Sequence, residues 1–194
     1  GQGDAILAVY KNIEILVDTG PDNKKLLGCL ERHLPFWDKE IEVVILTHGD
    51  SDHVGGLDDL LKGYKVEKIF SNEQENYSRK LGQNDVVKTN MFDFEVVSPR
   101  LSEGRVEDNN KNSIAGYLTY GGWTMFLTGD IDIETEQRLV WQKILDKEVD
   151  VLKVSHHGSA DGTSGELLDF LKPKTAVISV GKNNRYGHPR RSEE

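Results

Sequence analysis

Four side chains able to bind a metal ion stand within six consecutive positions of this chain. His48, Asp50, Asp52 and His53 come directly after the apolar run at 41–46, which predicts a buried strand. Imidazole and carboxylate ligands suit zinc, manganese or iron, and so short a run can supply two neighbouring ions. A polar loop with helix-capping aspartates is the structural alternative, but it gives no reason for the two histidines. We therefore expect a two-metal centre at the end of this strand.

The composition is that of a soluble globular protein. With 194 residues, 37% hydrophobic and 29% charged, and no composition break, we expect one domain over residues 1–194. No apolar run approaches the roughly 18 residues of a membrane span. The single cysteine, Cys29, excludes an intrachain disulfide and a zinc-thiolate cage, and the net charge of −9 opposes nonspecific binding to polyanions. No signal peptide is evident, and the last residues break off just after a motif, so we expect a fragment of a longer protein.

Short apolar runs with β-branched residues alternate with amphipathic stretches along the chain. The runs predict a hairpin at 5–9 and 13–17 and further strands at 41–46, 66–70, 92–97, 114–120, 123–127, 149–154 and 175–180. Helical spacing predicts helices at 23–34, 57–61, 133–145 and 165–171, whereas the polar stretch 72–88 has no clear pattern. Polar motifs at strand ends and interleaved helices favour an α/β protein in which helices cover a two-sheet sandwich.

Further segments match a known family together with the His48 cluster. The cluster resembles the metallo-β-lactamase superfamily signature His-x-His-x-Asp-His, with Asp50 where the second histidine usually stands. This variant is similar to the branch that contains ComEC-type DNA-uptake competence proteins and bacterial phosphorylcholine esterases. Six other segments match the ComEC-type pattern, in order and over nearly the whole chain: Gly1-Gln2-Gly3-Asp4-Ala5-Ile6, Val17-Asp18-Thr19-Gly20, Asn112-Ser113, Leu127-Thr128-Gly129-Asp130, Val154-Ser155-His156-His157-Gly158-Ser159 and Tyr186-Gly187-His188-Pro189. The resemblance implies an αββα sandwich of two mixed β-sheets flanked by helices.

The resemblance also implies two divalent metal ions, manganese or zinc, and assigns ligands to them. These ligands are His48, Asp50, Asp52, His53, Asp130 and His188. Asp130 would be the carboxylate between the two ions, with a helix cap as the structural alternative. The catalytic roles fall to Asp52, which shares the metal charge, and to His156, which contacts phosphate or protonates the leaving group. The reverse assignment, with His156 as ligand and His188 as substrate contact, stays open.

The superfamily usually supplies a third histidine to the first metal, and this chain has no histidine between His53 and His156. Asn112-Ser113 occupies the matching place, and an amide oxygen is a weaker ligand than imidazole. We therefore expect the first metal to bind loosely. Asp18 resembles a carboxylate that orients a metal-binding histidine, with a turn-forming aspartate as the alternative. The groups expected to contact substrate or to support ligands are Asp18, Asn112, Ser113, His157 and Ser159.

The implied activity is that of a metal-dependent phosphodiesterase, and more narrowly of a nuclease. The ions would activate water and neutralise developing charge while His156 assists the leaving oxygen. DNA is the expected substrate, the membrane-channel portion of the parent protein is the expected partner, and no nucleotide cofactor is expected. The domain would be a soluble part of a bacterial integral membrane protein, with the extracytoplasmic side favoured. Contact with DNA would be confined to the metal cleft and to a few basic residues that otherwise belong to solvated loops: Lys153, Lys182, Arg185, Arg190 and Arg191.

Two other functions stay open. The same chemistry could act on a small phosphodiester, such as a choline or nucleotide ester, whereas the depleted histidine set argues against β-lactam hydrolysis. The domain could instead have lost catalysis and serve as a binding module of a DNA transporter, which the absent third histidine motivates. Substrate screening and metal titration separate these hypotheses.

Overall fold

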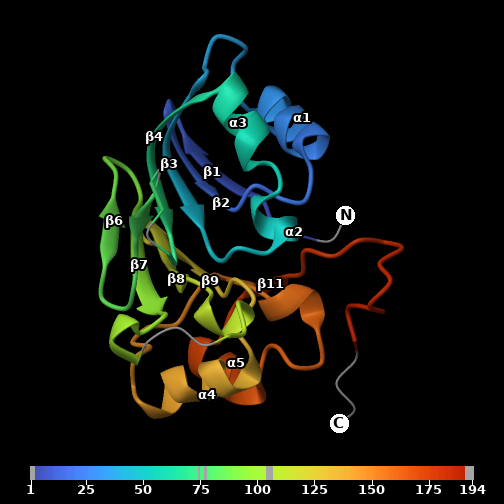
Figure 1. The fold of residues 1–194 in the computed structure, drawn as a ribbon. Helices are drawn as coiled ribbons and strands as arrows, with labels where there is room; N and C mark the ends of the chain where they lie inside the picture. The colour runs from blue at the N-terminus through green and yellow to red at the C-terminus, as the bar shows by residue number, and fades with distance from the viewer. Residues whose placement is uncertain (1–2, 74, 77, 104–106, 191–194) are drawn as a thin grey trace.

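Two mixed β-sheets pack face to face and carry helices on their outer sides (Figure 1). The computed structural model describes residues 3–73, 75–76, 78–103 and 107–190. The strand order is β1-β2-β3-β4-β5 in the first sheet and β11-β10-β9-β8-β7-β6 in the second. The α/β sandwich of two mixed sheets flanked by helices, expected from the sequence, is confirmed.

The first sheet begins with an antiparallel hairpin and continues in parallel. Its strands are β1 (Ile6–Tyr10), β2 (Ile13–Val17), β3 (Glu40–Leu46), β4 (Lys65–Ser71) and β5 (Arg79–Lys80). Its outer face is covered by α1 (Asn23–His33) and α3 (Leu57–Gly63), whose Leu30 and Leu60 pack with Leu16 of β2 and Val44 of β3. Because helices cover one face and the second sheet covers the other, β2 and β3 are nearly continuous hydrophobic runs.

The second sheet is an antiparallel meander extended by two parallel strands. The meander consists of β6 (Val86–Lys88), β7 (Asp93–Ser98), β8 (Ala115–Tyr120) and β9 (Trp123–Leu127), and the added strands are β10 (Val151–Lys153) and β11 (Thr175–Val177). Its outer face is covered by α4 (Ile133–Trp141) and α5 (Gly165–Leu171), which pack Leu139 and Leu167 onto Tyr117 and Phe126.

The main core lies between the two sheets. Val17 of β2 and Ile45 of β3 meet Phe94 of β7 and Leu118 of β8 there, all nearly inaccessible to solvent. Burying each such side chain stabilises the fold by about 1.5 to 3 kcal/mol. The edge of the sandwich is therefore a rigid support for the loops that follow the strands.

Some elements differ from the sequence predictions. The helix predicted at 133–145 ends at Trp141, because Lys143 adopts a left-handed conformation with φ 54°. The strand predicted at 149–154 keeps only Val151–Lys153. The unpatterned stretch 72–88 contains β5 and β6, and the four-residue helix α2 (Ser51–Val54) was not predicted. The described residues also form the short 3-10 turns η1 (Leu101–Glu103), η2 (Asn110–Asn112) and η3 (Ser155–Gly158).

Among the described residues, no helix combines the length and the apolar character needed to cross a bilayer.

Candidate metal centre

Four predicted site residues follow strands that run in parallel pairs. Asp18 comes after β2 and His48 after β3, and these two strands are parallel. Asp130 comes after β9 and His157 after β10, which are also parallel. The carboxyl ends of parallel strands are the usual place for a ligand site in an α/β protein, and here both sheets contribute one pair.

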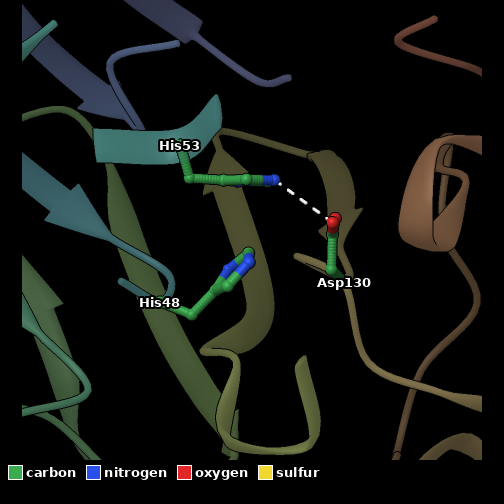
Figure 2. Close-up of side chains that lie close together, drawn as sticks. All are labelled: His48, His53 and Asp130. Carbon is green, nitrogen blue, oxygen red and sulfur yellow. Dashed lines mark hydrogen bonds and ion pairs between the residues drawn. The ribbon is translucent and has the colours of Figure 1, made fainter. Parts of the chain in front are cut away.

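His53 is held at both ring nitrogens. The short helix α2 carries it into the interior, where Nδ1 lies 2.7 Å from Oδ2 of Asp18. Its Nε2 lies 3.2 Å from Oδ2 of Asp130 (Figure 2). Asp18 also accepts hydrogen bonds from the backbone N–H and the hydroxyl of Thr47, at 2.7 and 2.8 Å. The contact expected between Asp18 and a histidine is therefore present, and it turns Nε2 of His53 toward Asp130.

His48 points one ring nitrogen into the same space. Its Nδ1 lies 3.0 Å from the hydroxyl of Thr47 and 3.0 Å from that of Ser113, whereas its buried Nε2 has no hydrogen-bond partner. The hydroxyl of Ser113 also accepts the backbone N–H of Asp130 at 3.2 Å, so this serine supports two site residues. Burial and the neighbouring His53 lower the pKa of His48, which keeps the ring in the neutral form that binds metals.

The two carboxylate oxygens of Asp130 contact different kinds of partner. Its Oδ2 faces Nε2 of His53 and, at 3.3 Å, Nε2 of His157, while its Oδ1 lies 3.2 Å from Nζ of Lys153. Burial works against the charged carboxylate, but Lys153 and the facing imidazoles hold the pKa of Asp130 well below its usual range. Lys153 is only 2% exposed and also contacts Asp4. Its expected role as a DNA contact is therefore wrong, because this lysine is enclosed by the core.

The two adjacent histidines of η3 point to different places. Both have left-handed backbone angles, with φ 44° at His156 and 55° at His157. This turn buries His157, whose Nδ1 donates to the carbonyl of Ser179 at 2.9 Å and whose Nε2 lies 3.4 Å from Oδ2 of Asp52. His157, which the sequence predicts to contact substrate or support ligands, thus lies inside the cluster of possible ligand atoms. The sequence-based assignment gives a place in that cluster to His188.

His156 and His188 lie together outside this cluster. The ring centroids of these two residues are 6.1 Å apart, and His188 stacks on Tyr186. The side chain of His156 is 26% exposed, with Nδ1 3.4 Å from Oδ1 of Asp161. The hydroxyl of Ser159 donates to the same carboxylate. These residues form a polar rim next to the buried ligands.

Two further predicted residues lie at the margin of the centre. Asp50 is 43% exposed at the side chain, accepts a hydrogen bond from Asn109 at 2.8 Å, and keeps Oδ2 3.7 Å from Nε2 of His48. Asn112 donates its amide to the carbonyl of Asp108 at 2.7 Å and lines a separate cavity of about 450 Å³ beside α4. The structure therefore brings Asp50 toward His48, whereas the amide N–H of Asn112 is engaged by the carbonyl of Asp108.

The donor atoms at the centre fit a metal ion. Ligand atoms of His48, His53 and Asp130 lie within 4.8 Å of one another, and the same is true of Asp52, His53 and His157. The Nε2 atoms of His48 and His157 are buried without a hydrogen bond, although carboxylates stand close by. Buried polar atoms are normally satisfied, and a cation would satisfy these. The imidazole and carboxylate set suits zinc, manganese or iron.

Carboxylates keep protons on two of the ligand rings when no cation is bound. Burial works to lower the pKa of His53, but Asp18 and Asp130 raise it to about 11. Burial also opposes the charged form of His157, yet Asp130 and Asp52 raise the pKa of this ring to about 9. A metal ion entering the centre must therefore displace protons.

Two cavities of opposite character flank the centre. One of about 720 Å³ opens beside Asp52 and is lined by basic side chains and an aromatic ring: Lys25, Lys182, Arg185 and Tyr186. The other, of about 440 Å³, opens beside His48 and is lined by Asp58, Glu73 and Glu75 among others. Asp22 also lines the first cavity and pairs with Lys25 at 3.0 Å, so Lys182 and Arg185 supply the positive charge there that no such pair among the described residues offsets.

The basic residues expected to contact DNA are distributed unevenly. Lys182 and Arg185 line the basic cavity, as stated above. Arg190 is exposed, and its backbone N–H donates to the carbonyl of Gly158 next to the histidine turn. Arg191 lies outside the described residues.

The sequence did not predict the structural role of two residues behind the candidate ligands. Asp4 and Lys153 form a buried ion pair of 2.6 Å that reaches Asp130. A signal for Asp4 existed in the matching segment at the start of the chain, but nothing there assigned it a role. Lys153 stands in an otherwise apolar strand pattern, which was a reason to expect a buried partner for it.

Comparison with known proteins agrees with the family resemblance of the sequence motifs. A family model described as the metallo-β-lactamase superfamily matches residues 1–182. ComE operon protein 3 of Bacillus subtilis (strain 168) is 33% identical over 223 residues, covering 97% of this chain and 28% of that protein. Competence protein ComA of Neisseria gonorrhoeae is 31% identical, covering 97% of this chain and 27% of that protein. The chain thus spans about a quarter of the length of these curated relatives.

A solved structure shows a similar fold. The metallo-β-lactamase fold protein YhfI from Bacillus subtilis superposes with a TM-score of 0.55 at 15% identity, covering 77% of this chain and 61% of that chain. At this level of identity the likeness concerns the arrangement of sheets and helices.

Proposed function

The chain belongs to the metallo-β-lactamase superfamily, and from this premise we propose that it is a metal-dependent phosphodiesterase that cleaves DNA. The family model and the competence proteins among the relatives support a metal-dependent hydrolase family. One observation carries the proposal of metal-dependent phosphodiester cleavage. The buried Nε2 atoms of His48 and His157 lack hydrogen bonds and lie close to the carboxylates of Asp52 and Asp130.

The ligands divide into a stronger and a weaker set. Asp52, His53, Asp130 and His157 would hold one divalent ion, and His48 with Asp50 would complete a second, looser site next to it. Bound divalent ions, manganese or zinc, would activate a water molecule and offset the charge that develops on phosphorus oxygens. The oxygen-rich set supports manganese as the working ion.

Residues of the basic cavity would bind the phosphodiester. Lys182 and Arg185 line the wall beside Asp52, together with Lys25, which pairs with Asp22, so positive charge would lie along the path of an incoming strand. Phosphate contacts of this kind are independent of base sequence. The ring of Tyr186, which is 51% exposed, stacks on His188, and a base could extend this stack.

A proton for the leaving oxygen would come from the rim. His156 is the candidate, because its ring is partly exposed at the edge of the buried ligands and is steadied by Asp161. His188, 6.1 Å away between ring centroids, would contact the substrate rather than the ion.

The parent protein would use this activity during DNA uptake. The names of the relatives, a ComE operon protein and a competence protein, support this role. The described part of the chain would then be one domain of a longer membrane protein, working with its DNA channel on the extracytoplasmic side.

A cleavage assay tests the proposal. We expect Mn²⁺-dependent cleavage of a labelled single-stranded DNA, lost by more than about a hundredfold in Asp52→Ala, because the variant lacks a ligand. Asp169→Ala, which changes an exposed aspartate on α5, is the matched control and should cleave like the parent chain. Absence of cleavage by the metal-loaded parent chain would contradict the nuclease.

A small phosphodiester is the second candidate substrate. The net charge of −9 and the acidic cavity beside His48 favour a small anion over a long one. Cleavage of a chromogenic diester such as bis-p-nitrophenyl phosphate, without cleavage of DNA, would establish this alternative. A chain that fails to bind divalent ions at micromolar concentration in a titration would instead be a binding module.

A further inference from the structure

A fully enclosed lysine lies directly behind the candidate ligands. The side chain of Lys153 is 2% exposed, and its Nζ lies 2.6 Å from Oδ2 of Asp4, 2.6 Å from the carbonyl of Gly129 and 3.2 Å from Oδ1 of Asp130. Burying an ammonium is costly unless carboxylates and hydrogen bonds compensate it, and here both do. Because the side chain is enclosed, Lys153 acts on the centre from within the protein and not by touching the substrate.

This contact leaves Asp130 with one oxygen for the ligand cluster. A carboxylate can bind a cation through one oxygen or through both. The ammonium of Lys153 occupies Oδ1, and Oδ2 faces the Nε2 atoms of His53 and His157. Rotation of the carboxylate would move Oδ1 away from Lys153, so the lysine fixes which oxygen is presented.

Asp4 holds the lysine in turn and links it to the ligand loop. The backbone N–H of Asp4 donates to the carbonyl of Asp52 at 3.2 Å, and the carbonyl of Gly3 accepts the hydroxyl of Ser179 at 2.8 Å. A Cβ at position 3 would collide with the backbone of Asp52, and Gly3 has φ 107°, so this close approach requires glycine. The start of the chain is thereby part of the support of the centre.

We propose that Lys153, anchored by Asp4, is a positioning residue of the metal centre that binds Oδ1 of Asp130 and so presents Oδ2 alone to the ion. The inference rests on the proposed metal centre and adds a support that acts through the ligand. The charge of the lysine also offsets that of Asp130 before an ion binds.

Cobalt substitution tests the role of Lys153, because the visible spectrum of bound Co²⁺ responds to the way its ligands bind. We expect Lys153→Met to bind Co²⁺ with a spectrum different from that of the parent chain. We also expect added metal to raise the melting temperature of Lys153→Met more than that of the parent chain, since the ion takes over the neutralisation of Asp130. A spectrum and a metal-induced shift equal to those of the parent chain would overturn the inference.

Two further variants keep the test decisive. Lys147→Met removes another lysine that pairs with a carboxylate, Glu95 of β7, at 2.7 Å. Because Glu95 is not a candidate ligand, this variant should leave the Co²⁺ spectrum unchanged. Asp4→Asn keeps Lys153 but weakens its anchor, and serves where Lys153→Met does not fold. We expect Asp4→Asn to change the spectrum in the same direction by a smaller amount, and an unchanged spectrum would contradict the inference. Failure of the parent chain to bind Co²⁺ would count against the metal centre itself.

Discussion

His156 and His157 are neighbours in the sequence, yet one lies on the rim and the other among the buried candidate ligands. The cause is local, because both residues take left-handed backbone angles in η3 and the chain turns between their side chains. The hydrogen bond from Nδ1 of His157 to the carbonyl of Ser179 then fixes the ring with Nε2 facing inward. The backbone angles of these two residues therefore decide which ring is buried and which lies on the rim.

Replacing each histidine separately tests this division. We expect His157→Ala to weaken the binding of Mn²⁺ by at least about tenfold, because its Nε2 lies among the ligand carboxylates. His188→Ala, which changes a rim residue, should bind Mn²⁺ within about threefold of the parent chain. Isothermal titration of both variants gives the comparison, and the opposite ranking would return His188 to the ligand set.

His48 tests the weaker site. We expect His48→Ala to abolish the second, looser Mn²⁺ binding event and to leave the first within about threefold, because Asp52, His53 and His157 stay in place. The same titration reports both events. Loss of the tight event would mean that His48 belongs to the principal site.

At the scale of elements, β2 and β3 place two carboxylates side by side at a distance from the metal centre. Glu14 is fully buried, both of its side-chain oxygens lack a hydrogen bond, and its backbone N–H donates to the carboxylate of Glu42 at 2.7 Å. Burial, with Glu42 next, raises the pKa of Glu14 to about 8 from the usual 4.5. The pair should make the stability of the first sheet depend on pH.

Glu14→Gln isolates that dependence. Between pH 4.5 and 8 the folded chain keeps the proton on Glu14 while the unfolded chain releases it, so the free energy of unfolding falls by up to about 1.4 kcal/mol per pH unit as the pH rises. We expect Glu14→Gln to be more stable than the parent chain at pH 8 and similar to it at pH 5, as measured by urea unfolding. Glu67→Gln, on the exposed side of β4, should show no such difference. Equal pH slopes for Glu14→Gln and the parent chain would contradict the raised pKa.

The sequence predicts the strands that carry a hydrophobic pattern and not the elements that depend on backbone pairing or on a local turn. β2 and β3 were predicted because strands buried on both faces are nearly continuous apolar runs. β5 was missed because two exposed residues, Arg79 and Lys80, carry no hydrophobic pattern and pair only through their backbone. The role of His157 could not be predicted either, because a turn of η3 and not strand alternation decides where its ring points.

At the scale of the whole molecule, the centre joins the two sheets. His48, His53 and Asp18 come from the first sheet and its loops, and Asp130 and His157 from the second. An ion bound between them would link the two halves of the sandwich and would stabilise only the folded chain.

Thermal unfolding measures this link. At a Mn²⁺ concentration about a hundredfold above the dissociation constant, binding adds about 2.7 kcal/mol, which corresponds to a rise in melting temperature of about 5 to 10 °C for a chain of this size. We expect EDTA to reverse the rise and Asp52→Ala to reduce it. An equal rise in Asp52→Ala would place the stabilising ion elsewhere on the chain.

An anomalous difference map tests the central claim most directly, because it reports the position, identity and ligands of bound ions together. For crystals grown with Mn²⁺ and measured at the manganese edge, we expect one strong peak among Asp52, His53, Asp130 and His157, and a weaker one beside His48. A map with no peak inside this cluster, or with ions only on the surface of the chain, would contradict the account.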